Sequence, residues 1–523
     1  MLGILALLIQ LILDTAVSWV RMFIALFISV LVGLAVGILA NRSQTAERII
    51  LPIFDILQTL PIVAFFPFVI YVVVATLPGI IGINAAVVFL IFTSMVWNIG
   101  FGAYEGIRTM PREYAEVSQV FQLSPIERLR KVLIPAAMPK VVEQSTLSWS
   151  IGLFYLVTSE IFSTGSKDYA VQYGIGPGLV HLAFSGNLAA YALGIIVFIA
   201  FVVATRLLFF RYLENRFVKR TTPRGGHSWL KLGQRRWRWG ERAEHRFAIA
   251  GKILERKTMA AIGWRNRLHE ARRIQRIIRN GTWTVLAGLV VIMIVVLLLN
   301  RGLASSELDV LYAMAFSLGR IWLAFALTLA IALPLGIYVV FMTKRSESYM
   351  VLFQILASIP ATVLLPAIVI AFKGAPYRGE LVALAIFFLS GFWYLLFSIV
   401  STRASMQESW EEAKEIFQVK GKSAWKYFYL KAVLPGLITG SITAIAAEWN
   451  ASIVAEYFTT TGISGGSVVS SVGTGLGKLL DLTLASGNIQ LMALGLINLT
   501  IVIIVVNRLL WKRSYNRVMS VYR

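Results

Sequence analysis

Long apolar runs follow one another along the chain, separated by short polar stretches. A helix needs about 20 apolar residues to cross the roughly 30 Å hydrocarbon core of a bilayer. Eleven runs of about that length are free of basic side chains, so we predict eleven membrane-spanning helices. They are 22–40, 56–75, 81–103, 141–161, 188–205, 282–300, 321–343, 349–372, 381–402, 432–455 and 488–507. A further run, 2–13, is too short to cross alone and is expected to lie in the interface or to pack as a half-helix.

Composition agrees with this pattern. Of the 523 residues, 58% are hydrophobic and 14% are charged, whereas soluble proteins have about 45–50% and about 25%. We therefore predict an all-α polytopic membrane protein. The chain has no Cys, which excludes disulfides, thiolate metal sites and cysteine nucleophiles. Three of its four His lie in one hydrophilic stretch, so we expect no metal site.

The net charge of +23 is concentrated on one segment. Residues 211–280 hold 20 of the 49 basic residues and only five acidic ones. The positive-inside rule makes this linker cytoplasmic, and counting spans puts the loops 104–140 and 403–431 and the C-terminus on the same side. Trp237, Arg238 and Trp239 are compatible with a nucleic-acid surface, but we favour contact with anionic lipid and expect no nucleic acid. An amphipathic helix is expected within 247–278.

The chain repeats itself. At an offset of 299, Ser18, Arg21 and Gly37 match Ser317, Arg320 and Gly336, and at an offset of 301 the stretch 185–187 matches 486–488. Repeats at a fixed offset indicate duplicated modules. We predict a first repeat at 1–213 with about five spans, the linker at 214–281, and a second repeat at 282–523 with about six. The extra span, 282–300, stands where the first repeat has only 2–13.

An amphipathic loop of about 30 residues joins the third and fourth core spans of each repeat. Its apolar edge is suited to a groove on a partner protein, and two such loops indicate a two-fold partner. The loop of the second repeat is interpreted as having four extra residues, 420–423. The candidate coupling residues are Glu116, Phe121, Gln122 and Pro135 in the first repeat, and Glu412, Phe417, Gln418 and Pro435 in the second.

With these loops and the duplication, the chain resembles the membrane subunits of ATP-binding-cassette importers, most closely the nitrate/sulfonate/taurine-type permeases. In that family a Gly follows the loop Glu by six positions, whereas Gln122 and Gln418 stand there in this sequence. The resemblance implies two parallel repeats of a type I importer domain in a bacterial or archaeal plasma membrane. It also implies an ATPase dimer on the two loops, an external substrate-binding protein and a small-molecule solute.

The chain itself lacks an ATP site. A phosphate-binding loop needs the pattern GxxxxGK[ST]. The stretch 421–423 has Ile416 where the first Gly must be, and Gly477-Lys478 is followed by Leu479. We therefore expect a translocation subunit without enzymatic activity and without a cofactor of its own, with ATP and Mg bound by the partner.

Polar and acidic residues late in each repeat are the candidate pathway. An ionisable group inside a span is costly and is a functional candidate by default. Glu448, near mid-span, is favoured as lining the route, with a cationic or hydrogen-bonding solute between two Trp faces. For Glu160 and Glu456 the alternative is a cap at a helix end before a Gly-rich segment. The candidates are Ser148, Trp149, Ser150 and Glu160, matched to Glu448, Trp449, Asn450 and Glu456.

A second function remains open from the residues alone. Parallel repeats also occur in secondary transporters, which would be driven by protons through Glu448 and Glu456 without an ATPase. The paired loops favour the importer, because a secondary transporter does not need two docking segments. The identity of the solute lies beyond the sequence.

Overall fold

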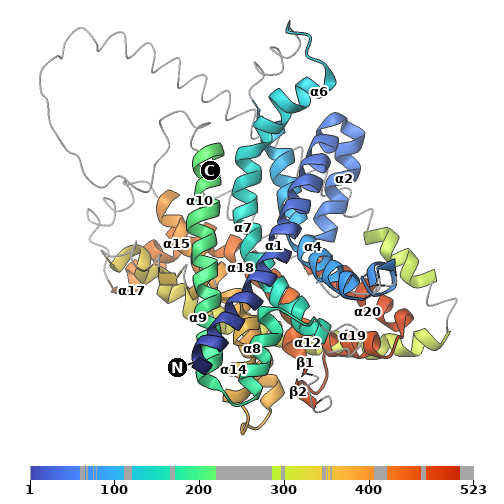
Figure 1. The fold of residues 1–523 in the computed structure, drawn as a ribbon, viewed down its shortest axis with the longest axis vertical. Helices are drawn as coiled ribbons and strands as arrows, with labels where there is room; N and C mark the ends of the chain where they lie inside the picture. Colours follow the sequence, from blue (N-terminus) through green and yellow to red (C-terminus); the bar gives the residue numbers. More distant parts are fainter. Residues whose placement is uncertain are drawn as a thin grey trace, which may run out of the picture.

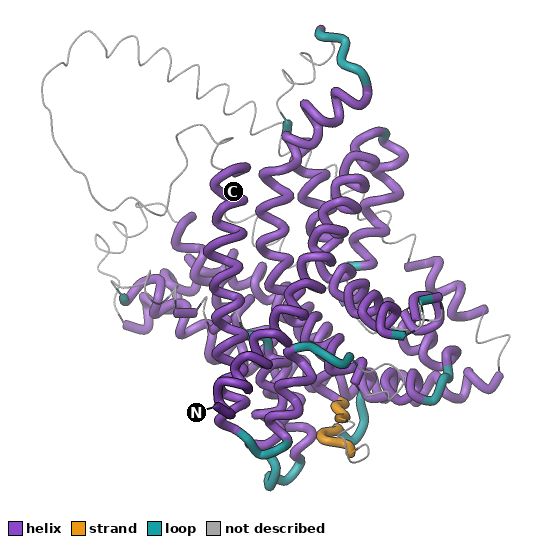
Figure 2. The backbone as a smooth tube through the Cα atoms, in the orientation of Figure 1, coloured by secondary structure: helices purple, strands orange, loops and turns teal. Residues whose placement is uncertain are grey.

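The structure is a computed structural model that describes residues 2–58, 65, 69–74, 76–77, 79–110, 120–164, 171–218, 286–295, 301–343, 349, 352–353, 356–357, 359–405, 421–460 and 467–506. These residues are almost entirely helical (Figures 1 and 2). Residues 219–285, which include most of the predicted linker, and the tail 507–523 lie outside the described residues, so the predictions of an amphipathic helix and of a lipid-binding surface are not tested.

The first repeat begins with a helix of 41 residues, α1. Its elements in order are α1 (Leu2–Arg42), α2 (Gln44–Leu57), η2 (Val69–Val74), α4 (Ile80–Arg108), α6 (Pro125–Arg128), η3 (Leu129–Leu133), α7 (Ile134–Thr164), α8 (Ile175–Phe184), α9 (Leu188–Ala204), η4 (Thr205–Phe210), α10 (Arg211–Leu213) and η5 (Glu214–Val218). The η segments are π-helical. Because the last four elements form one continuous helical run, the predicted boundary at 213 falls inside a helix that continues to Val218.

The second repeat follows the same order. A short helix, Leu286–Val295, precedes it. Its elements are α12 (Arg301–Ile337), η6 (Tyr338–Met342), α14 (Ala361–Ala371), α15 (Arg378–Ser405), α17 (Gly421–Ala424), η7 (Trp425–Tyr429), α18 (Leu430–Glu456), β1 (Tyr457–Thr460), β2 (Ser467–Ser471), α19 (Leu476–Ala485) and α20 (Ile489–Val506). The antiparallel hairpin β1–β2 forms the sheet of the described residues.

Seven described helices are long and apolar enough to cross a membrane. Seven of the predicted spans coincide with them, and an eighth, 141–161, lies within α7. The other three are not continuous in the described residues: 56–75 includes the end of α2 and η2, 349–372 includes α14, and 282–300 includes Leu286–Val295. The all-α polytopic fold is confirmed.

The first helix of each repeat is longer than predicted. The run 2–13 was expected to lie apart from the first span, yet it forms the beginning of α1, and its counterpart in α12 is 301–312 rather than the extra span 282–300. The predicted spans begin only after Arg21 and Arg320, because a span was expected to contain no basic side chain. Those charges are tolerated inside a span because each is paired with an acid, as described below.

The element boundaries show which residues of the two repeats correspond. From α6, η3 and α7 to α17, η7 and α18, each start is displaced by 296 residues. The predicted four-residue insertion at 420–423 is therefore wrong, and Pro435 corresponds to Pro139 instead of Pro135. Both Pro139 and Pro435 lie inside their helices. From α8 to α19 the displacement is 301 residues, as predicted.

Each repeat is built around three packed helices, α1–α4–α7 and α12–α15–α18. Small residues allow the close approach. A methyl group added at Gly37 would lie 2.6 Å from Cβ of Ala103 on α4, and one at Gly336 would lie 2.5 Å from Cγ2 of Ile399 on α15. Such contacts are typical of helix pairs in membranes. The repeated glycine thus marks the crossing of α1 with α4 and of α12 with α15.

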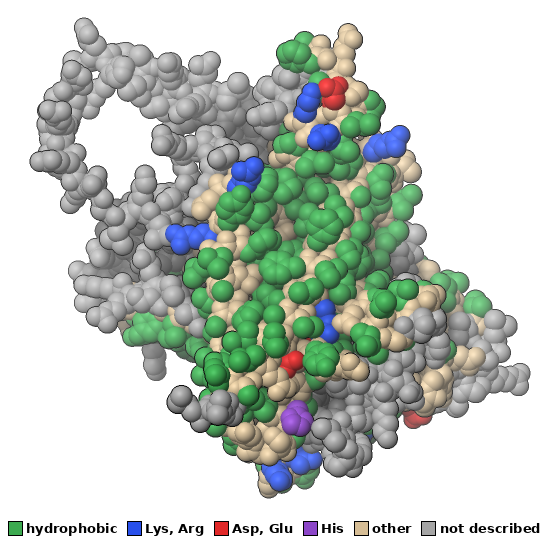
Figure 3. Space-filling model, in the orientation of Figure 1, with side chains coloured by type: hydrophobic (Ala, Val, Ile, Leu, Met, Phe, Trp, Pro, Cys, Tyr) green, Lys and Arg blue, Asp and Glu red, His purple; other side chains and the backbone are tan. Residues whose placement is uncertain are grey.

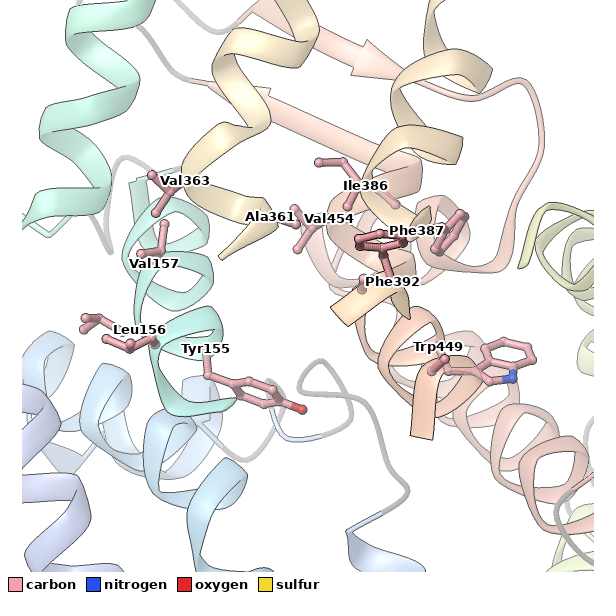
Figure 4. Packing of buried hydrophobic residues seen from close by; sticks show 14 of the residues in the cluster. Tyr155, Leu156, Val157, Ala361, Val363, Ile386, Phe387, Phe392, Trp449 and Val454 are labelled. Atoms are coloured by element: carbon pink, nitrogen blue, oxygen red, sulfur yellow. The ribbon is translucent and has the colours of Figure 1, made fainter. Parts of the chain in front are cut away.

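The two repeats contact each other through α14. Helix α14 of the second repeat packs against α7 and α8 of the first, and Val363 on α14 lies near Val157 on α7 in Figure 4. The Tyr191 hydroxyl donates to the carbonyl of Val363 at 2.6 Å. Hydrophobic side chains cover most of the face seen in Figure 3, with Lys and Arg mostly toward the end that carries α6.

Candidate functional site

A buried cluster in the first repeat, called here the first clamp, joins three helices through Ser18, Arg21 and Glu160. Glu160 is fully buried. Its Oε1 accepts from Ser18 Oγ at 2.7 Å and from Arg21 Nη1 at 2.5 Å, and its Oε2 accepts from the backbone N–H of Gly176 at 3.0 Å. The N–H of Ile175 donates to Ser18 Oγ at 3.0 Å. The start of α8 is thereby tied to α1 and to the end of α7.

The second repeat contains the same arrangement, the second clamp, made by Ser317, Arg320 and Glu456. Arg320 Nη1 donates to Glu456 Oε1 at 3.0 Å, and the N–H of Gly477 donates to Glu456 Oε2 at 2.7 Å. The N–H of Leu476 donates to Ser317 Oγ at 2.8 Å. The clamp residues that the offsets of 299 and 301 pair are therefore in equivalent structural positions.

Helix geometry explains the clamps. The first N–H groups of a helix have no partner within it, and leaving them unpaired inside a membrane is costly. Glu160 and Glu456 satisfy such groups in α8 and α19 and face their positive helix ends, while Arg21 and Arg320 balance the carboxylates. This geometry favours the capping alternative for both acids. Their role in the pathway stays a prediction.

The clamps also show which residues of α7 and α18 correspond to each other. Trp149 lies 11 residues before Glu160, but Trp449 lies only seven before Glu456. Since both helices are continuous there, the two Trp are not equivalent, and matching 148–150 with 448–450 is wrong. Trp149 packs against rings of its own repeat, Trp19, Phe23 and Phe210.

At the correct register, Glu448 corresponds to Gly152 and the facing Gly391 corresponds to Met95. In the second repeat the Glu448 carboxyl packs directly against Gly391 on α15. In the first repeat Met95 on α4 packs directly against Gly152. Large and small residues have thus exchanged helices between the repeats. Glu448 is fully buried, and neither of its carboxylate oxygens has a hydrogen-bond partner among the described residues.

One side of α7 and of α18 is less covered than the rest. On α18 the stripe consists of Thr439, Thr443, Ala446 and Asn450; on α7 it consists of Glu143, Leu147, Ser150 and Phe154. Both stripes have the spacing of one helix face, and they correspond position by position at the offset of 296. Asn450 and Phe154 are half-buried, and the other six are exposed.

Beside the α7 stripe, the hydroxyl of the buried Tyr155 donates to Asn450 Oδ1 of the α18 stripe at 3.2 Å, which joins the first repeat to the second. In Figure 4 the Tyr155 hydroxyl extends away from α7, while the ring of Trp449 points away from Tyr155. Of the predicted pathway residues, Ser150 and Asn450 lie on the stripes. Ser148, Trp149, Glu448 and Trp449 are buried within their own repeats.

Sequence reasoning missed Tyr155 and the Thr of the α18 stripe. The signal was present, because Thr439, Thr443 and Asn450 are spaced by four and seven residues in an otherwise apolar helix. The prediction of Glu448 relied on its charge, although a helix face of hydroxyl and amide side chains is the stronger helical pattern.

The described part of the first loop presents an apolar tip. Val120 and Phe121 are 77% and 72% exposed. The next turn is held by a capping box, in which Ser124 Oγ and Glu127 bond each other's backbone N–H. Lys131, at 2.8 Å, and Ser124 lower the pKa of Glu127 from 4.5 to about 2, so this group is ionised at neutral pH. Pro135 is the second residue of α7, and Glu116, Glu412, Phe417 and Gln418 lie outside the described residues.

Gln122 stands where the related loops have Gly, and its φ is 47°. Only Gly adopts this left-handed region without a steric penalty. The turn therefore keeps the conformation that suits Gly, although the residue has changed. In the second loop, Gly421 has a φ of 62°.

Replacing Gln122 by Gly should raise stability, because the left-handed conformation costs a residue with a Cβ about 1 kcal/mol. We expect a small rise in the midpoint of thermal unfolding of the purified protein in detergent. Gln122→Val should lower the midpoint, since β-branched residues tolerate this region least. Equal midpoints for the two variants would contradict a left-handed turn at this position.

These features are typical of a membrane transport protein made of two parallel repeats, with a less buried stripe at equivalent positions of α7 and α18. A family model described as "binding-protein-dependent transport system inner membrane component" matches residues 29–219 and 328–514. The two matches cover more than half of the chain, so the protein belongs to this family as a fused tandem permease. The resemblance predicted from the loops and the duplication is confirmed.

Individual relatives match shorter stretches. The chain is 27% identical over 130 residues to the bicarbonate transport system permease protein CmpB of Synechococcus elongatus and to the nitrate import permease protein NrtB of Leptolyngbya laminosa, covering 25% of this chain. It is 32% identical over 162 residues, 31% of this chain, to the glycine betaine/proline betaine transport system permease protein ProW of Escherichia coli. Each match spans 44% of the relative.

Proposed function

We propose that this chain is the complete translocation pathway of an ATP-binding-cassette importer, with both permease halves on one polypeptide. The observation that carries the proposal is the pair of stripes on α7 and α18, which lie at the same register in the two repeats. A route between two pseudo-equivalent helices needs a matched face on each, and the hydrogen bond from Tyr155 to Asn450 joins α7 to α18 beside these faces.

The energy for transport is proposed to come from separate ATPase subunits. They would dock on the loops 104–140 and 403–431, for which the exposed apolar tip at Val120 and Phe121 is the supporting observation. ATP and Mg would bind to those partners and not to this chain. With the loops and the C-terminus placed in the cytoplasm by the positive-inside rule, the clamps lie at the external ends of α7 and α18, where a substrate-binding protein would deliver the solute.

The solute is proposed to be small and polar. The names of the relatives include bicarbonate, nitrate and betaine permeases, so an ion or a zwitterion is within the range of the family. Anionic lipid at the basic linker is a separate proposal from the sequence. Comparing the binding of the full-length chain to anionic and to zwitterionic liposomes would test it.

Purification from the native membrane tests the central proposal. The chain alone should hydrolyse no ATP, whereas the complex isolated with its partners should hydrolyse ATP and contain two ATPase subunits for each chain. Mass spectrometry of the complex would identify the partners and any bound solute. Proton-driven uptake by the isolated chain in vesicles without ATP would instead support the secondary transporter.

A further inference from the structure

The two clamps share their Ser, Arg and Glu but differ in the residue that binds the Arg from α4 or from α15. In the first clamp, Arg21 Nε donates to Asn84 Oδ1 on α4 at 2.7 Å. In the second, Arg320 donates to both oxygens of Glu380 on α15, from Nε at 2.5 Å and from Nη2 at 2.8 Å. Asn84 and Glu380 correspond at the offset of 296.

These links have unequal strength. A bidentate pair between a guanidinium and a carboxylate is charge-assisted and geometrically matched, whereas an amide oxygen accepts a single bond without a charge of its own. Glu380 also accepts from the N–H of Gly473 before α19, at 3.4 Å. Asn84 uses its amide nitrogen within its own helix, donating to the Ile80 carbonyl at 2.8 Å. At the clamp, α15 is therefore held by more and stronger polar bonds than α4.

The first repeat has a second acid in another place. Asp14 is buried on α1 and lies against Gly178 of α8. Its counterpart at the offset of 299 is Ala313. The additional acid of the first repeat thus lies between α1 and α8, while that of the second repeat binds Arg320 and connects α12 to α15.

We propose that Arg21 and Arg320 are positioning residues with unequal effects, so that at the clamp end α4 separates from its repeat more readily than α15 does. The second repeat then acts as the fixed half at this end, and the first repeat as the half that opens. The inequality is a property of the chain itself; its use in the transport cycle rests on the proposed function.

Backbone hydrogen exchange of the purified full-length chain tests this inference without nucleotide or partners. Residues 83–90 of α4 and 379–386 of α15 occupy equivalent positions, so their protection factors can be compared directly. We expect several-fold less protection in α4, because Arg320 makes two bonds to a carboxylate on α15, whereas Arg21 makes one bond to an amide oxygen on α4. The amides of α8 and α19, capped alike in both clamps, should differ much less.

Two substitutions should move the protection in opposite directions. Asn84→Glu gives α4 the acid of α15 and should raise protection in 83–90, while Glu380→Asn should lower it in 379–386. Glu105→Gln, at the far end of α4 in an exposed ion pair with Lys140, is the matched control and should leave both segments unchanged.

Equal protection of the two segments in the unmodified protein would overturn the inference, and so would a difference that neither substitution alters. If one variant fails to fold, the comparison within the unmodified chain still decides. Because the measurement involves no ATPase, its failure leaves the transport proposal standing, and a failure of ATPase binding leaves this inference standing.

Discussion

A chain with Asp in place of both Phe121 and Phe417 should be recovered without ATPase subunits. Phe121 is 72% exposed at the tip of its loop, and burying a Phe side chain contributes about 1.5–3 kcal/mol. Loss of that burial at two loops, together with a carboxylate facing an apolar groove, should weaken assembly by several orders of magnitude. The ratio of ATPase to permease after affinity purification, and the ATP hydrolysis of the eluate, measure the effect.

The Leu variants at the same two positions are the matched control. Leu keeps an apolar side chain without the ring, so Phe121→Leu with Phe417→Leu should retain most of the bound ATPase. Phe417 lies outside the described residues, and its part in the prediction rests on the repeat. A double Asp variant that binds ATPase at the unmodified ratio would eliminate the docking role of these loops.

Glu448→Gln should reduce transport while leaving protein level and ATPase binding unchanged. The carboxyl is fully buried, and neither oxygen has a partner among the described residues. An acid at mid-span costs about 2.5 kcal/mol or more, and this conformation shows no interaction that offsets the cost. We expect the solute or another state of the cycle to supply the partner, so uptake in reconstituted vesicles should fall by roughly tenfold or more, since 1.4 kcal/mol is a factor of ten.

Glu448→Met separates this role from packing. The facing position, Gly391, corresponds to Met95, and the first repeat fills the same contact with Met95 against Gly152. If Glu448 only fills space, the Met variant should transport the solute as the unmodified chain does. If the carboxyl is required, both the Gln and the Met variants should be slow, and normal uptake by both would remove Glu448 from the mechanism.

The sequence predicted the architecture better than the site. Long apolar runs and identical residues at fixed offsets can be recognised directly in the sequence, and the fold confirms them. The buried ion pairs were missed because the partners Arg21 and Glu160 are 139 residues apart, and no local pattern connects them. The predicted span therefore begins after Arg21, although Glu160 balances the charge of Arg21 within the bundle.

The site was misaligned for a related reason. The two Trp form a conspicuous pair in the sequence, and aligning them required an insertion in the loop. Helix boundaries and clamp contacts show a register without that insertion. Ser150 and Asn450 lie on the stripes, and their part in the route stays a prediction. Tyr155, the partner of Asn450, could not be predicted, because this contact depends on how the two repeats approach each other.

The exchange of Met95 and Gly152 for Gly391 and Glu448 has a consequence for the history of the duplicated halves. A bulky residue on one helix is accommodated by a glycine on its neighbour, and the two repeats have made opposite choices. Neighbouring helices must therefore have changed together. A chimera that replaced α7 with the sequence of α18 alone would set Glu448 against Met95, and one that moved α15 alone would leave two glycines facing each other. At this contact, only a chimera that exchanges both helices together keeps a large side chain against a glycine.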